Sequence, residues 1–185
     1  MLASFVLGQL LFYSCHIPHD REIICEQNFK KASELAHNNP TRNSALDSSL
    51  TILNRCMQCD SIKAAVVDLK IRLLITLGKF KEGAKFIDSL TVSDFIYPYK
   101  KKLNHDNFIA RKFTSDNDTL SRNKVLRQMA SDLESYINSN NLKSKEFQEA
   151  FIDLTEIDSI TSYRLIDSLK IKYPNEVKFL DFFKR

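Results

Sequence analysis

The chain has no tryptophan, and its 185 residues include only three glycines and four prolines. Tight β-hairpin turns and phosphate-binding loops depend on glycine, because glycine takes positive φ without a steric penalty. The shortage therefore disfavours a hairpin-rich β fold and a nucleotide-binding fold. No segment alternates apolar and polar residues over the length of a strand, so β structure has little support.

The sequence also lacks a large excess of charge of one sign. Its formal net charge is +4, and lysine and arginine are spread along the chain among aspartate and glutamate. A nucleic-acid-binding protein usually concentrates its basic residues on one element. The one basic run, at residues 100–102, is more typical of a solvated helix face. We therefore expect no nucleic-acid partner.

Catalytic motifs are missing as well. The chain has no G-x-S-x-G, no H-E-x-x-H and no glycine-rich phosphate loop. None of its four histidines has an obvious nucleophile and carboxylate partner in sequence. Residues 116–118 resemble the start of a calcium loop, but the loop lacks its glycine, and Arg127 stands where the bidentate glutamate belongs. We expect no catalytic residues, no metal and no cofactor, and so not an enzyme.

Cys56 and Cys59 form the most specific short motif, a C-x-x-C. Such a pair can be half of a zinc site, a redox pair or a local disulfide. A zinc site needs a second pair of ligands, for which His16 and His19 have suitable spacing. A redox pair usually sits at the start of a helix, whereas this one follows a predicted helix. Structural thiols and a Cys56–Cys59 disulfide, which leaves Cys25 unpaired, stay open as alternatives.

Residues 2–14 carry no charge and are mostly apolar. The stretch is shorter than the ~20 residues of a membrane-spanning helix and suits the apolar region of a signal peptide. Ser14-Cys15 resembles the lipobox of bacterial lipoproteins, which implies a lipid anchor on the sulfur of Cys15. Another export signal or a buried first helix are the alternatives. We expect a signal segment at 1–15 and a single α-helical domain at 16–185.

Apolar residues recur at helical spacing through the rest of the chain. A short polar tether at 16–19 is expected to precede the first helix. The pattern predicts helices over 20–37, about 43–57, 61–77, 80–90, 95–113, 120–138, 144–154, 161–172 and about 177–183. Gly78 is expected to end the third helix in the left-handed conformation.

The stretch Leu77-Gly78-Lys79-Phe80, followed by Ala84, resembles the centre of a tetratricopeptide repeat. The resemblance implies a Leu-Gly pair that ends one helix, an aromatic residue that opens the next, and a close helix contact at Gly83 and Ala84. Residues 172–174 resemble the end of such a repeat, with its terminating proline. We expect an all-α fold of antiparallel helical hairpins, arranged as a tetratricopeptide-like right-handed repeat or as a compact helical bundle.

The family resemblance implies a concave surface that binds peptides or proteins. We expect a non-catalytic, protein-binding lipoprotein of the bacterial cell envelope that faces the periplasm or the cell surface. It resembles immunity proteins, which neutralise a toxin by direct binding. An envelope assembly or accessory factor and an intracellular, cytoplasmic regulator are the alternatives. The partner-binding candidates are polar or aromatic positions off the apolar stripes: Lys63, Lys70, Arg72, Tyr97, Tyr99 and Lys101.

Overall fold

The computed structural model describes residues 17–184 of the chain. Regular structure in this range consists of α-helices and short 3-10 turns without any strand, which confirms the all-α prediction. No helix within it is long and apolar enough to cross a membrane. The signal-like segment at 1–15, with the predicted lipidation site Cys15, lies outside the described residues.

We expected a single domain over residues 16–185, and the helices of the described residues group into two compact units. The first unit contains residues 17–79 with 94–96, and the second contains 80–93 with 97–184. The first ends just after Gly78, inside the stretch that carries the tetratricopeptide resemblance. Each unit is described by itself.

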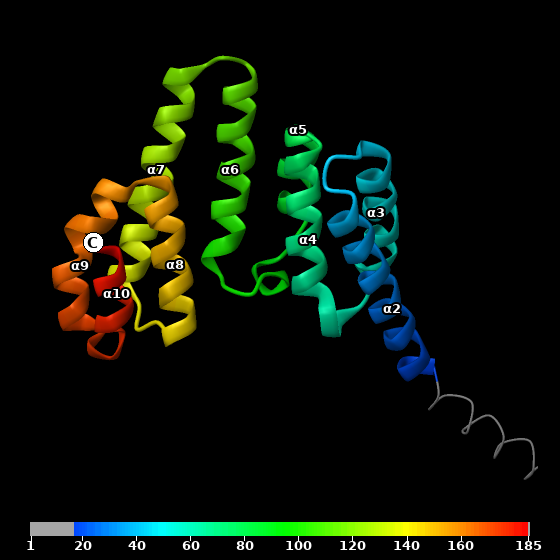
Figure 1. The fold of residues 1–185 in the computed structure, drawn as a ribbon, viewed down its shortest axis with the longest axis horizontal. Coiled ribbons are helices and arrows are strands. Elements are labelled where there is room, and N and C mark those ends of the chain that lie inside the picture. Colours follow the sequence, from blue (N-terminus) through cyan, green and yellow to red (C-terminus); the bar gives the residue numbers. More distant parts are fainter. Residues whose placement is uncertain (1–16, 185) are drawn as a thin grey trace, which may run out of the picture. The chain divides into compact units, whose positions relative to one another are not determined.

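The first unit contains α2 (Ile17–Asn38), α3 (Asn43–Cys56), the 3-10 turn η1 (Asp60–Ile62) and α4 (Lys63–Thr76). Helices α2 and α3 pack side by side as a hairpin (Figure 1). Small side chains let them approach, because Ala32 and Ser49 are fully buried and the Ser49 hydroxyl donates a 2.8 Å hydrogen bond to the Ala32 carbonyl.

Helix α2 differs from its prediction in two ways. It begins at Ile17, so the tether expected at 16–19 is helical from its second residue; extending an existing helix by one residue costs little. The apolar spacing that predicts this helix includes Ile23 and Ile24, but both side chains are exposed. The face that α2 buries is instead marked by Cys25 and Ala32, seven residues apart and therefore on one side of the helix.

Gly78 ends α4 as predicted. Its φ is +68°, the left-handed region that favours glycine. The Lys79 amide donates to the Leu74 carbonyl at 2.9 Å, and the Gly78 amide donates to the Ile75 carbonyl at 3.0 Å. This pair of bonds is a Schellman motif, which satisfies carbonyls that the helix end leaves without partners.

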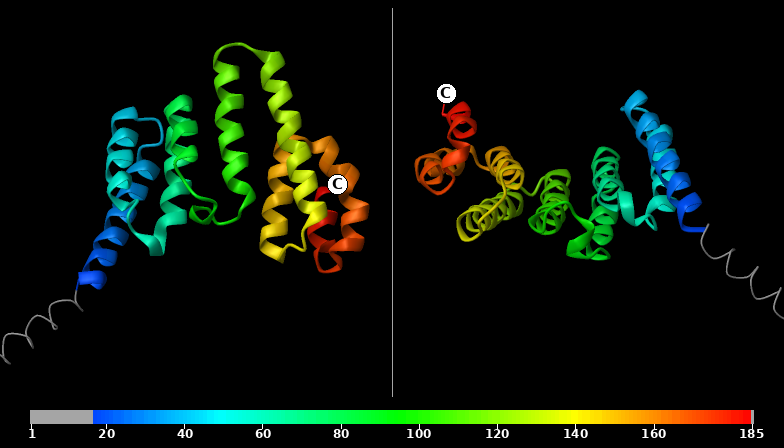
Figure 2. Two further views of the ribbon diagram at one scale, coloured as in Figure 1. Left: turned by 180° about the vertical axis from the view of Figure 1, so that it is seen from behind. Right: turned by 90° about the horizontal axis from the view of Figure 1, so that it is seen from below.

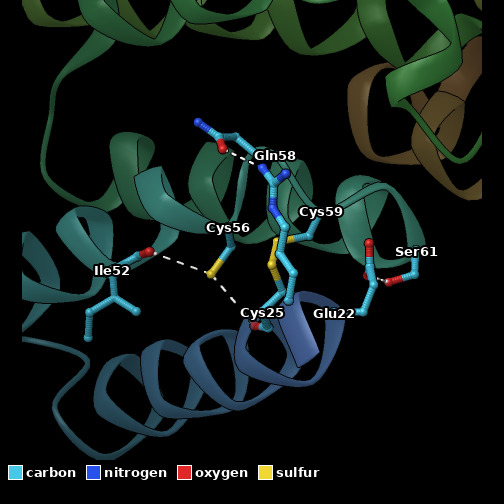
Figure 3. Close-up of a disulfide and its surroundings, with 8 residues drawn as sticks. Glu22, Cys25, Ile52, Cys56, Gln58, Cys59 and Ser61 are labelled. Atoms are coloured by element: carbon cyan, nitrogen blue, oxygen red, sulfur yellow. Dashed lines mark hydrogen bonds between the residues drawn. A yellow bond between two sulfur atoms is a disulfide. The ribbon is translucent and has the colours of Figure 1, made fainter. Parts of the chain in front are cut away.

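The cysteine pairing differs from the candidate pair Cys56–Cys59, which is wrong. The structure joins Cys59 to Cys25 of α2, with 6.1 Å between their Cα atoms, and leaves Cys56 as a free, buried thiol (Figure 3). Cys56 is the last residue of α3, and its Sγ lies 3.5 Å from the Ile52 carbonyl and 3.7 Å from that of Cys25. Cys59, beyond the helix end, is the cysteine that reaches α2.

Burial raises the pKa of the Cys56 thiol above its ordinary value. The protonated thiol is a poor nucleophile, so Cys56 is a structural residue and the C-x-x-C is not a redox pair. The turn around the disulfide is also tied to α2 by side-chain bonds from Arg21 to Gln58 and from Ser61 to Glu22 (Figure 3).

Removing the disulfide should destabilise the protein far more than removing the free thiol. The bond closes a 34-residue separation, for which chain entropy gives about 3 to 4 kcal/mol. Cys25→Ala should therefore lower the free energy of unfolding by about that amount, and the control Cys56→Ala by about 1 kcal/mol. Denaturant unfolding without reductant measures both, and non-reducing peptide mapping should recover the Cys25–Cys59 link. A Cys56–Cys59 peptide in the wild type would contradict this pairing.

The second unit contains α5 (Phe80–Asp88), α6 (Tyr99–Ser115), α7 (Thr119–Ser139), α8 (Ser144–Ile157), α9 (Ser159–Lys172), the 3-10 turn η3 (Pro174–Glu176) and α10 (Val177–Phe183); the turn η2 (Val92–Asp94) lies in the connection from α5 to α6. Each helix from α5 to α9 packs against the next one, and α10 packs on α9 (Figures 1 and 2).

The turn between α6 and α7 explains why these two long helices form a hairpin. Asn117 takes a left-handed φ of 58°, and the Asp118 amide donates to the Phe113 carbonyl at 2.9 Å. Asp118 then caps α7, because its side chain accepts a 2.9 Å hydrogen bond from the Ser121 amide. Residues 114–119, which lie between two predicted helices, thus contain the end of α6 and the start of α7 with only a short turn between them.

The core of the second unit is built around α8. Phe147 and Phe151 of α8 are fully buried. Three aromatic residues near the C-terminus surround them with ring centroids 4.2–6.1 Å away: Tyr173, Phe179 and Phe183. Four of the 13 phenylalanines of the chain therefore gather in one apolar cluster, and α8 lies at its centre.

Gly83 brings α5 close to α6. A Cβ atom built on Gly83 would lie 2.1 Å from Cε1 of Phe108, a fully buried ring of α6. The close contact at Gly83 is therefore made with α6, the helix that follows α5 in the chain.

Gly83→Ala should destabilise the second unit. Alanine is normally the better helix residue, but here its methyl group would overlap the Phe108 ring, and such overpacking typically costs about 1 to 3 kcal/mol. The double variant Gly83→Ala/Phe108→Leu should regain part of the loss, since leucine leaves room for the methyl group. Thermal unfolding of the two variants and of Phe108→Leu alone measures the coupling. Additive losses would show that the two positions do not compete for space.

Candidate functional site

A pocket of about 200 Å³ opens between α6 and α7 in the second unit. Each helix contributes residues at the spacing i, i+3, i+4 and i+7, which lie on one face of a helix. We call it the main pocket, and its lining is Tyr99, Lys102, Leu103, Asp106, Met129, Asp132, Leu133 and Tyr136. The two stripes face each other because α6 and α7 form a hairpin (Figure 1).

Two tyrosines form the wall of the main pocket nearest to α8. The rings of Tyr99 and Tyr136 have centroids 5.0 Å apart. Their hydroxyls donate to carboxylates of α8, from Tyr99 to Asp153 at 2.8 Å and from Tyr136 to Glu146 at 2.6 Å. Burial is the main cause that raises the pKa of both phenols, and the neighbouring carboxylates raise it further. Both phenols therefore stay protonated donors.

Charged side chains form the open side of the main pocket. The ammonium group of Lys102 lies 2.6 Å from Oδ2 of Asp106 and 2.7 Å from Oδ2 of Asp132. Burial opposes the charge of Lys102, but its hydrogen bonds to both carboxylates outweigh this and raise its pKa. The other oxygens of the two carboxylates contact His105 at 3.1 Å and Gln128 at 3.0 Å. The lysine side chain is 60% exposed, so its ammonium group lies between the carboxylates at the mouth.

Two further pockets adjoin the main pocket, and Lys102 and Asp106 line all three. One, of about 450 Å³, continues between α6 and α7 past Phe113 and Lys124. The other, of about 350 Å³, lies on the α5 side of α6 and is lined also by His105. The Lys102–Asp106 face of α6 is thus a wall that all three pockets share.

The structure places the six partner-binding candidates in two groups. Lys63, Lys70 and Arg72 belong to α4 in the first unit, where they contact Asp94, Asn54 and Asp68 in that order. The other three belong to the second unit. Tyr99 lines the main pocket, Tyr97 stacks on Tyr99 with ring centroids 6.1 Å apart, and Lys101 lines the pocket on the α5 side.

Sequence reasoning missed Lys102, Asp106, Asp132 and Tyr136. The run at residues 100–102 looked like a solvated face, but successive helical residues point about 100° apart. Lys100 binds Asp153 of α8 at 2.7 Å, Lys101 donates to the Leu90 carbonyl, and only Lys102 reaches the main pocket. The sequence did contain a signal for the main pocket. In both α6 and α7 the lining residues have the spacing i, i+3, i+4, i+7, and each set includes an aspartate.

Within residues 17–184, no group of three or more His, Cys, Asp or Glu side chains is arranged to hold a metal ion. The zinc alternative for Cys59 is excluded by its disulfide to Cys25. No protein-family model, curated protein or solved structure matches the chain.

Tyr99→Phe tests whether the phenol of Tyr99, in the wall of the main pocket, stays protonated in the folded protein. Near neutral pH the loss of the bond to Asp153 should cost about 1 kcal/mol of unfolding free energy. Above about pH 10 Tyr99 ionises in the unfolded chain but, because of its raised pKa, not in the folded protein. The wild type therefore loses about 1.4 kcal/mol of unfolding free energy per pH unit in this range. The variant has no phenol at this position and does not lose it. The difference in stability should therefore shrink as the pH rises.

Denaturant unfolding between neutral pH and about pH 11 measures this effect. Tyr163→Phe, which removes a half-exposed phenol of α9, is the control and should leave stability nearly unchanged. A gap between wild type and Tyr99→Phe that stays constant above about pH 10 would contradict a retained proton on Tyr99.

Proposed function

We propose that the chain is a non-catalytic binding protein that holds part of another protein on the Lys102–Asp106 face of α6. The observation that carries the proposal is that three adjoining pockets share this face. Apolar walls with a charged edge are typical of protein-binding surfaces. The main pocket, at about 200 Å³, is smaller than the roughly 300–1,000 Å³ of pockets for small ligands, and its size suits one side chain of a protein partner.

The chemistry of the main pocket supports binding over catalysis. Its lining contains no serine, threonine or cysteine that could act as a nucleophile. Its charged groups are engaged with one another, since Lys102 binds both aspartates and both phenols donate to α8. Groups that are paired with one another in this way are less available for proton transfer to a substrate.

The disulfide supports export. Disulfides persist in oxidising compartments and are rare in the cytosol, where thiols are kept reduced. A buried Cys25–Cys59 bond therefore favours the proposal of a lipoprotein anchored through Cys15 in the bacterial cell envelope over an intracellular regulator. Within the envelope, an immunity protein that neutralises a toxin by direct binding is our leading proposal, and an assembly or accessory factor is the alternative.

The packing order supports a helical-repeat architecture. In such proteins each helix contacts mainly its neighbours in sequence, and the array offers an extended binding surface. Helices α5 to α9 follow this order. A tetratricopeptide-like repeat stays our proposal for the relationship between these helices.

A photo-crosslinking amino acid at position 124 should capture the partner. Lys124 lines the larger adjoining pocket, whereas Arg127, three residues later on α7, lines none of the three. Both are exposed basic residues of one helix, so p-benzoylphenylalanine at either position changes charge equally. In cells that make the protein naturally, illumination should give a discrete protein adduct from position 124 and little from position 127. Equal adducts, or none from either position, would contradict the proposed binding face.

A further inference from the structure

The surroundings of the main pocket are more negative than the chain as a whole. Five carboxylates line the pocket or bind the side chains directly behind it: Asp106, Asp132, Glu146, Glu149 and Asp153. Two lysines pair with them, Lys100 and Lys102. With histidine counted as neutral, this leaves an excess of three negative charges, although the whole chain carries +4.

From this arrangement we infer that the main pocket receives an arginine side chain of the partner protein, whose guanidinium replaces the Lys102 ammonium between Asp106 and Asp132. The inference rests on the proposed function and names the chemistry that this site recognises.

The position of Lys102 shows that a cation fits there. Its ammonium group contacts one oxygen of each aspartate at 2.6 and 2.7 Å, within the range of charge-assisted hydrogen bonds. The Lys102 side chain is 60% exposed, and ion pairs of exposed lysines contribute little to stability, so moving this side chain into solvent costs little. A guanidinium is planar and forms several hydrogen bonds at once, which suits two carboxylates on facing helices.

The rest of the lining suits the remainder of an arginine side chain. Leu103, Met129 and Leu133 offer apolar surface to its aliphatic stem. Tyr99 and Tyr136 add aromatic rings to the lining, and the ring of Tyr136 can make a cation–π contact with the guanidinium. Their hydroxyls are turned to α8 and held by Asp153 and Glu146, so the rings stay in place when the pocket is empty.

An acidic partner group is the opposing possibility, because Lys102 is the cation at the mouth. Such a group would have to displace two carboxylates from Lys102 and then remain beside them. Like charges at this distance disfavour that arrangement. Lys102 would have opposite effects on the two occupants. It would bind an acidic group, whereas it competes with an arginine for Asp106 and Asp132.

Methyl NMR of the full disulfide-bonded chain tests the inference directly. The probe is N-acetylarginine amide, and the matched control is N-acetylcitrulline amide, which has nearly the same shape without the charge. The Met129 methyl signal should shift in a saturable way with arginine and not with citrulline. Equal shifts with both, no shift with either, or a shift with N-acetylglutamate amide would overturn the inference.

Substitutions should change arginine binding in opposite directions. Lys102→Gln removes the competing ammonium and should tighten binding by roughly three- to tenfold. Asp132→Asn removes one carboxylate and should weaken binding by roughly tenfold. Weaker binding by Lys102→Gln would overturn the inference. If Asp132→Asn fails to fold, Lys102→Gln decides alone, because a folding defect cannot tighten binding.

The crosslinking experiment separates this inference from the proposed function. An adduct from position 124 that is unchanged by Lys102→Gln and by Asp132→Asn would leave the binding face in place and refute the arginine site. No adduct from position 124 would refute the binding face itself. An adduct that grows with Lys102→Gln and shrinks with Asp132→Asn is the result that we expect.

Discussion

Two hydrogen bonds from phenols to carboxylates, Tyr99 to Asp153 and Tyr136 to Glu146, fix the α6–α7 hairpin to α8. Helix α8 is in turn fixed by the buried aromatic cluster around Phe147. The main pocket is therefore supported by buried packing on its α8 side, and its open side is made of charged side chains. A binding surface that is held in shape before the partner arrives loses less conformational entropy when it binds.

The helices could be predicted because their information is local. Apolar spacing and the glycine at position 78 reflect contacts within one or two turns of a helix, and both were confirmed. The main pocket depends on how two helices face each other, which spacing in one helix does not determine. Lys102 looks like its neighbours Lys100 and Lys101 in sequence, and only the positions of Leu90, α7 and α8 give the three lysines different partners.

The cysteines show the same limit of prediction from the sequence. Cys56 and Cys59 are neighbours in sequence, and both sulfurs lie near Cys25, but only Cys59 is bonded to it. Cys59 pairs with a residue 34 positions away, because the α2–α3 hairpin brings Cys25 back to the end of α3. Helix pairing decides which sulfurs meet, and that pairing is a tertiary property.

The charge around the main pocket is negative, whereas the net charge of the protein is positive. Distance determines which of the two acts on a bound partner. At physiological salt the Debye length is about 8 Å, so exposed charges further away are largely screened. Asp106 and Asp132 line the main pocket itself, so their charges act on its contents with little screening. Inside the main pocket the local negative charge therefore prevails, and a basic side chain can be recognised by a protein that is basic overall.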